Sequence, residues 1–122
     1  MKDREPRVVI IEDDGDWQSV FSRVLEGMGC LVVGTAVSME TALELVARLG
    51  EQQVDAVLLD GNLSQDAHDG SEGKQLAEKI RMEAPGVKII GVSAENQSYA
   101  HGNIGKFPFD KEKMKAVLFP KE

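Results

Sequence analysis

The stretch Arg7 to Asp14, RVVIIEDD, decides the fold of this 122-residue chain. Its first part is an apolar, β-branched run that is too short for a helix, so it predicts a strand buried on both faces. Acidic residues follow directly. The stretch Asp55 to Asp60, DAVLLD, repeats this design, apolar through its length and acidic at its carboxyl end. Together they predict two strands of a parallel sheet with carboxylates at one edge.

Helices and further strands are predicted on either side of these two segments. Apolar residues spaced three and four apart predict helices, and short apolar runs predict strands. The first expected helix is 15–28, with an apolar face formed by Trp17, Val20, Phe21, Val24, Leu25 and Met28. The second is 38–50, with an apolar face formed by Met39, Ala42, Leu43, Val46 and Leu49. A third is marked by Leu76, Ala77 and Ile80, and a short last helix is expected at 110–119. The further strands are 30–36, 87–92 and 103–107. Residues 61–72 show no periodicity.

The segment between Ser93 and Lys106 is too short for a complete helix with two loops. A mean helix takes about 11 residues, and each loop takes about 2–6 more. We therefore expect a doubly wound α/β fold with a five-stranded parallel sheet, in one domain over residues 1–122, with the fourth helix shortened or missing. Ligands of such folds bind at the carboxyl ends of the strands. Here those ends carry Glu12, Asp13, Asp60, Ser93 and Lys106.

The composition excludes several classes of protein. Fourteen Lys and Arg against twenty-one Asp and Glu give a net charge of −7, which disfavours direct binding to nucleic acid. No apolar run approaches the roughly 20 residues of a membrane span, and the start lacks a signal-peptide pattern, so we expect a cytoplasmic protein without membrane insertion. The single cysteine, Cys30, excludes an intrachain disulfide and is expected to be a small buried apolar residue.

The carboxylates at the strand ends predict a metal site. Carboxylates about 4 Å apart repel by roughly 4 kcal/mol per pair at an effective dielectric constant of 20, so they need a cation. Oxygen ligands without His or Cys suit Mg²⁺, which also binds phosphate oxygens. Beside such a cation Asp60 could attack phosphorus as a nucleophile, with Lys106 carrying part of the charge, and Ser93 could hydrogen-bond a phosphoryl oxygen.

This arrangement resembles the receiver domains of two-component response regulators, including the single-domain chemotaxis regulator, over nearly the whole chain. The acidic pair Glu12-Asp13 in VVIIEDD and the acid Asp60 in AVLLDGNL match the family's metal-binding pair and phosphoacceptor. The resemblance implies that Glu12, Asp13 and Asp60 bind Mg²⁺ together with the backbone carbonyl of Asn62.

Three further segments carry the resemblance. Ser93-Ala94 in IIGVSA matches the family's Ser/Thr-Ala, Lys106 in GKFPFD matches its lysine, and Gly73 to Arg81 resembles the helix after the phosphoacceptor loop. The resemblance implies a flavodoxin-like strand order, 2-1-3-4-5. It also implies a signalling protein rather than an enzyme, which takes a phosphoryl group from a histidine kinase or a histidine phosphotransfer protein. Any catalysis would be limited to its own dephosphorylation. Because the chain leaves no room for an output domain, we expect output through contacts with a downstream protein.

The sequence also departs from the family pattern. The loop 61–72 is longer than usual and has Ser64 in place of Pro, Phe107 separates Lys106 from Pro108, and Asn103 and Ile104 stand near the place of the usual switch aromatic. The shortened fourth helix and the displaced Lys106 favour an alternative, a pseudo-receiver that binds partners without phosphorylation, whereas the intact acidic set opposes it. A minor alternative is a phosphatase of the haloacid dehalogenase type. Its general acid would lie at position 62, where Asn62 cannot transfer a proton.

Overall fold

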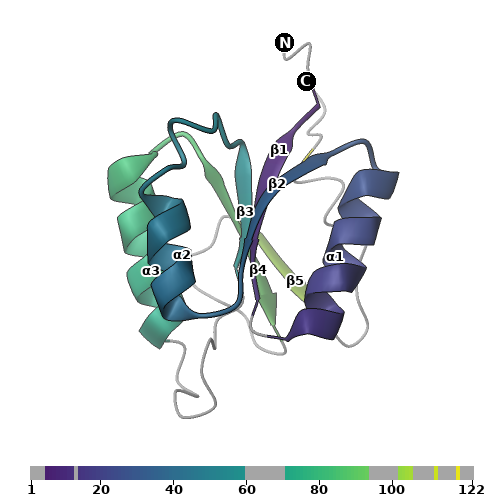
Figure 1. Cartoon of the computed structure of the whole chain (residues 1–122), viewed down its shortest axis with the longest axis horizontal. Helices are drawn as coiled ribbons and strands as arrows, with labels where there is room; N and C mark the ends of the chain where they lie inside the picture. The colour runs from purple at the N-terminus through teal and green to yellow at the C-terminus, as the bar shows by residue number, and fades with distance from the viewer. Residues whose placement is uncertain are drawn as a thin grey trace.

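The computed structural model has a five-stranded parallel sheet in the order β2-β1-β3-β4-β5 (Figure 1). It describes residues 5–12, 14–59, 71–93, 102–105, 112 and 118. The elements are β1 (Arg7–Ile11), α1 (Gly15–Gly27), β2 (Leu31–Ala36), α2 (Met39–Val46), β3 (Ala56–Leu59), α3 (Ser71–Glu83), β4 (Lys88–Ser93) and β5 (Gly102–Gly105). The predicted doubly wound α/β fold and its strand order are confirmed.

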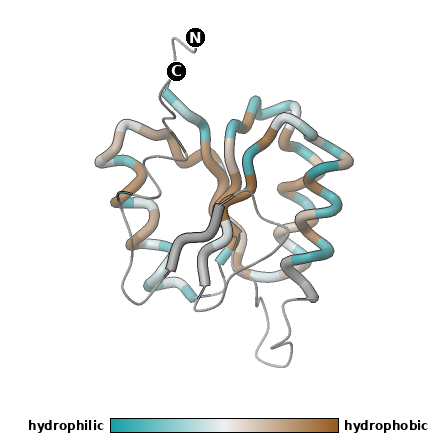
Figure 2. Tube along the Cα trace, turned by 180° about the vertical axis from the view of Figure 1, so that it is seen from behind, coloured by the Kyte–Doolittle hydropathy of each residue, from teal (hydrophilic) through white to brown (hydrophobic). Residues whose placement is uncertain are grey.

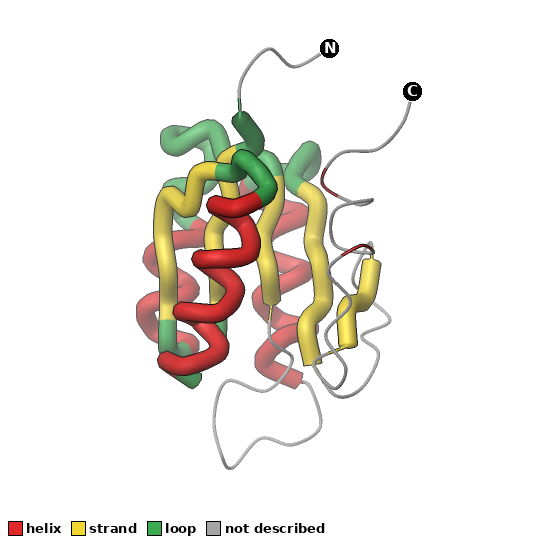
Figure 3. The backbone as a smooth tube through the Cα atoms, turned by 90° about the vertical axis from the view of Figure 1, so that its right-hand side faces the viewer, coloured by secondary structure: helices red, strands yellow, loops and turns green. Residues whose placement is uncertain are grey.

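Helices cover both faces of the sheet. Helix α1 lies against one face, and α2 and α3 lie against the other (Figures 1 and 3). Hydrophobic residues concentrate along the strands and on the inner sides of the helices (Figure 2). The core therefore consists of two clusters. One is centred on Phe21 and Leu25 of α1, and the other joins α2 and α3 through Val46, Leu76 and Ile80.

The central strands are buried as their apolar sequences predict. Residues Val8–Ile11 of β1 and all four residues of β3 are buried. In contrast, β2 is an edge strand and is only partly buried, and Leu31 at its start is 44% exposed. Edge strands lack a neighbour on one side, so an apolar sequence there does not lead to full burial.

Two positions expected on apolar helix faces point away from the core. Val20 of α1 is 41% exposed and Leu43 of α2 is 37% exposed, so their predicted burial is wrong. In α2 the side chain of Leu45 packs against the core instead. Its Cδ2 atom lies 3.0 Å from where a Cβ on Gly34 would stand. The spacing identifies a helix face correctly, but the rotation of the helix against the sheet decides which flank of that face is covered.

The helix ends follow local signals in the sequence. The carboxylate of Asp14 caps α1, and Gly29 with φ of 91° follows its end. Ser38 begins α2 in a capping box with Thr41, whose backbone N–H donates to Ser38 Oγ. Helix α3 begins at Ser71, within the segment 61–72 for which no helix was predicted.

Several predictions fall outside the described residues. The shortened or missing fourth helix concerns residues 94–101, which the structure does not describe. The predicted fifth strand, 103–107, is observed at Gly102–Gly105. Of the last helix only Glu112 and Leu118 are described, both in helical conformation. Leu118 is 8% exposed and belongs to the cluster on the α1 side of the sheet.

Cys30 is a buried core residue, as predicted, and packs in the cluster on the α1 side of the sheet. Burial, with a smaller contribution from the negative charge of Glu5, raises the pKa of its thiol. Across the part of the chain that the structure describes, no helix has the length and apolar character that crossing a membrane requires.

Candidate functional site

The strand register brings the carboxyl ends of four strands to one edge of the sheet. Ile11, the last residue of β1, pairs with Leu59, the last residue of β3. Leu59 pairs with Gly91 of β4, and Ser93 at the end of β4 pairs with Gly105 at the end of β5. Adjacent parallel strands lie about 4.8 Å apart. The chain therefore leaves these strands from neighbouring positions.

Most of the predicted site residues end one of these strands or directly follow it in the sequence. Glu12 directly follows β1, Asp60 directly follows β3 and Lys106 directly follows β5, while Ser93 is the last residue of β4. Of the predicted set, the structure describes Glu12 and the backbone position of Ser93. The other four lie outside the described residues: Asp13, Asp60, Asn62 and Lys106.

Glu12 is a buried acidic residue at the end of a buried strand. Its side chain is 1% exposed. Among the described residues, Glu12 is the one charged residue whose side chain is buried. Its backbone N–H donates to the carbonyl oxygen of Ala36 at 3.0 Å, which extends the pairing of β1 with β2 by one step. Removing a carboxylate from water costs several kcal/mol, so a buried carboxylate at a loop entry needs a compensating charge or donors.

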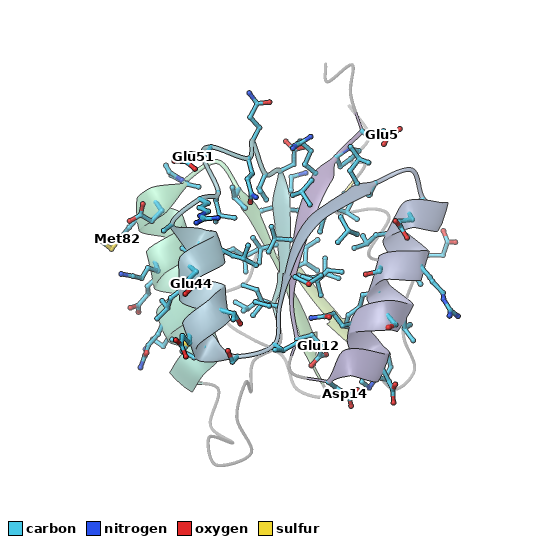
Figure 4. All side chains as sticks on the ribbon, viewed as in Figure 1. Glu5, Glu12, Asp14, Glu44, Glu51 and Met82 are labelled. Atoms are coloured by element: carbon cyan, nitrogen blue, oxygen red, sulfur yellow. The ribbon has the colours of Figure 1, made fainter. Side chains whose placement is uncertain are left out.

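The turn from β1 into α1 supplies one such donor. The backbone N–H of Asp14 donates to Glu12 Oε2 at 3.4 Å. Asp14 Oδ1 in turn accepts from the backbone N–H groups of Asp16 at 2.8 Å and Trp17 at 3.3 Å. Figure 4 shows Glu12 and Asp14 at the same end of the sheet, where α1 begins, and Glu5 and Glu51 at the opposite end. The positive end of the α1 dipole thus faces the acidic edge.

Gln18 is a residue at this edge that the sequence patterns did not single out. Its amide nitrogen donates to the carbonyl oxygen of Ala36 at 3.3 Å and to that of Glu12 at 3.5 Å. It is a half-buried polar residue beside Trp17 on α1. That position, on the flank of an apolar helix face directly after an acidic loop, is the signal that could have indicated it.

Trp17, the single tryptophan, is half-buried on α1. Its ring lies 5.4 Å from that of Phe21, centroid to centroid, at 30°. Its backbone N–H donates to Asp14 Oδ1, so Trp17 lies in the first turn of α1, beside the acidic edge. Its fluorescence is therefore a natural probe of this site.

The donor types at this edge fit a hard divalent cation. Glu12 supplies a buried carboxylate, and the acids next to it and after β3 supply the same ligand type. Mg²⁺ takes oxygen ligands, usually one or two carboxylates with water and phosphate. Within the described residues no three His, Cys, Asp or Glu side chains gather, and Asp13 and Asp60 lie outside that set. The case for the metal therefore rests on Glu12 and on the strand register.

Comparison with known proteins identifies the family. The family model of the response regulator receiver domain matches residues 8–106. The chain belongs to this family. No curated protein sequence matches it significantly. The family confirms the resemblance seen in the sequence and favours it over the haloacid dehalogenase hypothesis.

Solved structures confirm the receiver fold. A CheY-like receiver domain from Methylobacillus flagellatus is 22% identical with a TM-score of 0.73, covering 93% of this chain and 96% of that one. A Burkholderia pseudomallei response regulator with a phosphorylated aspartic acid, calcium ion and citrate is 20% identical with a TM-score of 0.74, covering 95% and 68%.

A third structure is longer than this receiver. The response regulator PhyR from Brucella abortus is 24% identical with a TM-score of 0.72. The match covers 93% of this receiver but only 46% of the Brucella protein, so the receiver spans about half of that regulator's length. Receiver domains are in general signalling modules of two-component systems and not enzymes, which agrees with the expectation from the sequence.

Proposed function

We propose that this receiver takes a phosphoryl group on Asp60 and signals through contacts with other proteins. The observation that carries the proposal is the buried carboxylate of Glu12, which directly follows β1. Strand β1 pairs in register with β3, the strand that precedes Asp60 in the sequence. Glu12, Asp13 and Asp60, with the backbone carbonyl of Asn62, are the proposed Mg²⁺ ligands. A bound Mg²⁺ would neutralise charge on the phosphoryl oxygens and on the attacking carboxylate.

The proposed reaction is an in-line phosphoryl transfer. A carboxylate oxygen of Asp60 forms a bond to phosphorus while the bond from phosphorus to the donor breaks. When the donor is a phosphohistidine, the electron pair of that bond returns to the imidazole nitrogen, which then takes up a proton. The product is an aspartyl phosphate. Its hydrolysis by water would restore Asp60 and release inorganic phosphate, and this self-dephosphorylation is the one catalytic step that we assign to the chain.

Ser93 and Lys106 are proposed to stabilise the phosphoryl group. Ser93 ends β4 and pairs with Gly105, which directly precedes Lys106 in the sequence, and Asp60 directly follows the neighbouring strand β3 in the sequence. A hydroxyl donor and an ammonium group are both suited to phosphoryl oxygens. This pairing supports a shared role for Ser93 and Lys106.

The proposed partners follow from the same chemistry. A histidine kinase or a histidine phosphotransfer protein supplies the phosphoryl group, and a downstream protein responds to the change. Phosphorylation adds about −1.5 to −2 charges and three acceptor oxygens at one edge of the sheet. Such a local change of charge can shift the equilibrium between two conformations of a binding surface. We place these exchanges in the cytoplasm.

Intact mass spectrometry after incubation with acetyl phosphate and Mg²⁺ tests the proposal. The wild-type protein is expected to gain one phosphoryl group, and the gain should disappear in Asp60→Asn and after chelation of Mg²⁺. Asp16→Asn is the matched control, because Asp16 is an exposed carboxylate in the first turn of α1 and should leave the adduct unchanged. A folded wild-type protein without an adduct would overturn the proposal in favour of a pseudo-receiver.

A further inference from the structure

One side chain of α1 holds the ends of two neighbouring strands. The amide nitrogen of Gln18 donates to Ala36, the last residue of β2, and to Glu12, which directly follows β1. A primary amide has two N–H donors on one nitrogen, so it can serve two carbonyl acceptors at once. The acceptor atoms lie 3.3 Å and 3.5 Å away, so both bonds are long.

The contact with Glu12 controls the direction of the backbone at the acidic edge. The carbonyl of Glu12 belongs to the peptide group that leads to the next residue, and a peptide group is planar. Holding this oxygen therefore holds the plane in which the chain continues. On the near side the N–H of Glu12 donates to Ala36, and on the far side the N–H of Asp14 donates to Glu12 Oε2.

The backbone of Gln18 also takes part in the first turn of α1. Its own backbone N–H donates to the carbonyl oxygen of Asp14 at 2.9 Å, in the first turn of α1. Gln18 thus makes backbone and side-chain hydrogen bonds to residues on both sides of position 13. Its side chain links the orientation of α1 to the backbone of Glu12.

We infer that Gln18 is a positioning residue of the Mg²⁺ site, acting through the backbone of Glu12. The inference rests on the proposed function, because it assigns Gln18 to the metal site proposed there. Gln18 contacts the carbonyl of Glu12 and not its carboxylate, so it orients a ligand residue instead of binding the metal. Partners that orient metal ligands typically change metal affinity by about 10–100-fold.

The test measures Mg²⁺ affinity of Gln18→Met by titration, followed through backbone amide NMR shifts. Methionine keeps the unbranched shape and removes both donors. The dissociation constant is expected to rise by about 10-fold. Gln52→Met is the matched control, since Gln52 is equally half-buried but lies before β3, at the other end of the sheet. Its affinity for Mg²⁺ should equal that of the wild type.

Thermal unfolding without Mg²⁺ separates positioning from general stability. Because both hydrogen bonds are long, Gln18→Met should lower Tm by no more than about 5 °C. An unchanged Mg²⁺ affinity in Gln18→Met, with wild-type binding intact, would overturn the inference and leave the proposed function standing. A wild-type protein that binds no Mg²⁺ would overturn both.

A second variant covers the case in which Gln18→Met does not fold. Gln18→Asn keeps the amide but shortens its reach by one methylene, so it cannot hold both carbonyls. It should also bind Mg²⁺ more weakly than the wild type. A wild-type affinity in this variant would likewise overturn the inference.

Discussion

Replacement of Asp14 by alanine removes the cap of α1 at the acidic edge. The lost acceptor is Asp14 Oδ1, which takes hydrogen bonds from the backbone N–H groups of Asp16 and Trp17. Loss of such a cap costs about 1 kcal/mol, and loss of a negative charge at a helix N-terminus costs about 0.5 kcal/mol more. We therefore expect Asp14→Ala to lower the free energy of unfolding by about 1.5 kcal/mol.

The expected change in melting temperature follows from the size of the chain. Unfolding entropy is roughly 2.1 cal/mol/K per residue, so for 122 residues a loss of about 1.5 kcal/mol lowers Tm by about 6 °C. Urea denaturation followed by circular dichroism, at neutral pH and without Mg²⁺, gives the free energy, and an unchanged m value shows that both states are comparable.

Asp14→Asn separates the cap from the charge. Asparagine caps helices about as well as aspartate, so only the charge is lost. The asparagine variant should lie within about 0.5 kcal/mol of the wild type. Equal destabilisation of both variants, or an alanine variant as stable as the wild type, would refute the capping argument.

Two further predictions concern the core. Leu58→Ala should lower the free energy of unfolding by about 3 kcal/mol, because Leu58 is 1% exposed within the central strand. Leu43→Ala, at a position that is 37% exposed, should lower it by less than about 1 kcal/mol. Equal losses of unfolding free energy in urea denaturation would contradict the assigned helix rotation. The raised pKa of Cys30 means that the folded state holds this proton more tightly than the unfolded state. Its contribution to stability should be complete below about pH 8.5 and should fall as the pH rises further. Relative to Cys30→Ala, the wild type should therefore lose stability in alkaline buffer, and parallel stability profiles of the two proteins would contradict the assigned burial.

The central strands and the acidic edge could be predicted because their determinants are local. An apolar run of strand length ending in an acid has few alternatives in an alternating α/β pattern, and this covers β1 and β3. The cap at Asp14 is equally local. The predicted burial of Val20 and Leu43 failed because periodicity gives the helix face but not its rotation against the sheet.

The role of Gln18 depends on a contact that no local pattern shows. Its acceptor Ala36 lies eighteen positions away in the sequence and reaches Gln18 only because β2 pairs with β1. The start of α3 at Ser71 was missed for a related reason, since its first residues carry no apolar periodicity. Packing of Leu76 and Ile80 against the sheet stabilises this helix from its middle.

The most direct test of the central claim is to locate the phosphoryl group within the chain. Borohydride reduces an aspartyl phosphate to homoserine, so protein treated with acetyl phosphate and Mg²⁺ can be reduced, digested and sequenced by tandem mass spectrometry. The account predicts homoserine at position 60 and unmodified aspartate at positions 13, 14 and 16. Homoserine at another carboxylate, or at none in a protein that remains folded, would contradict it.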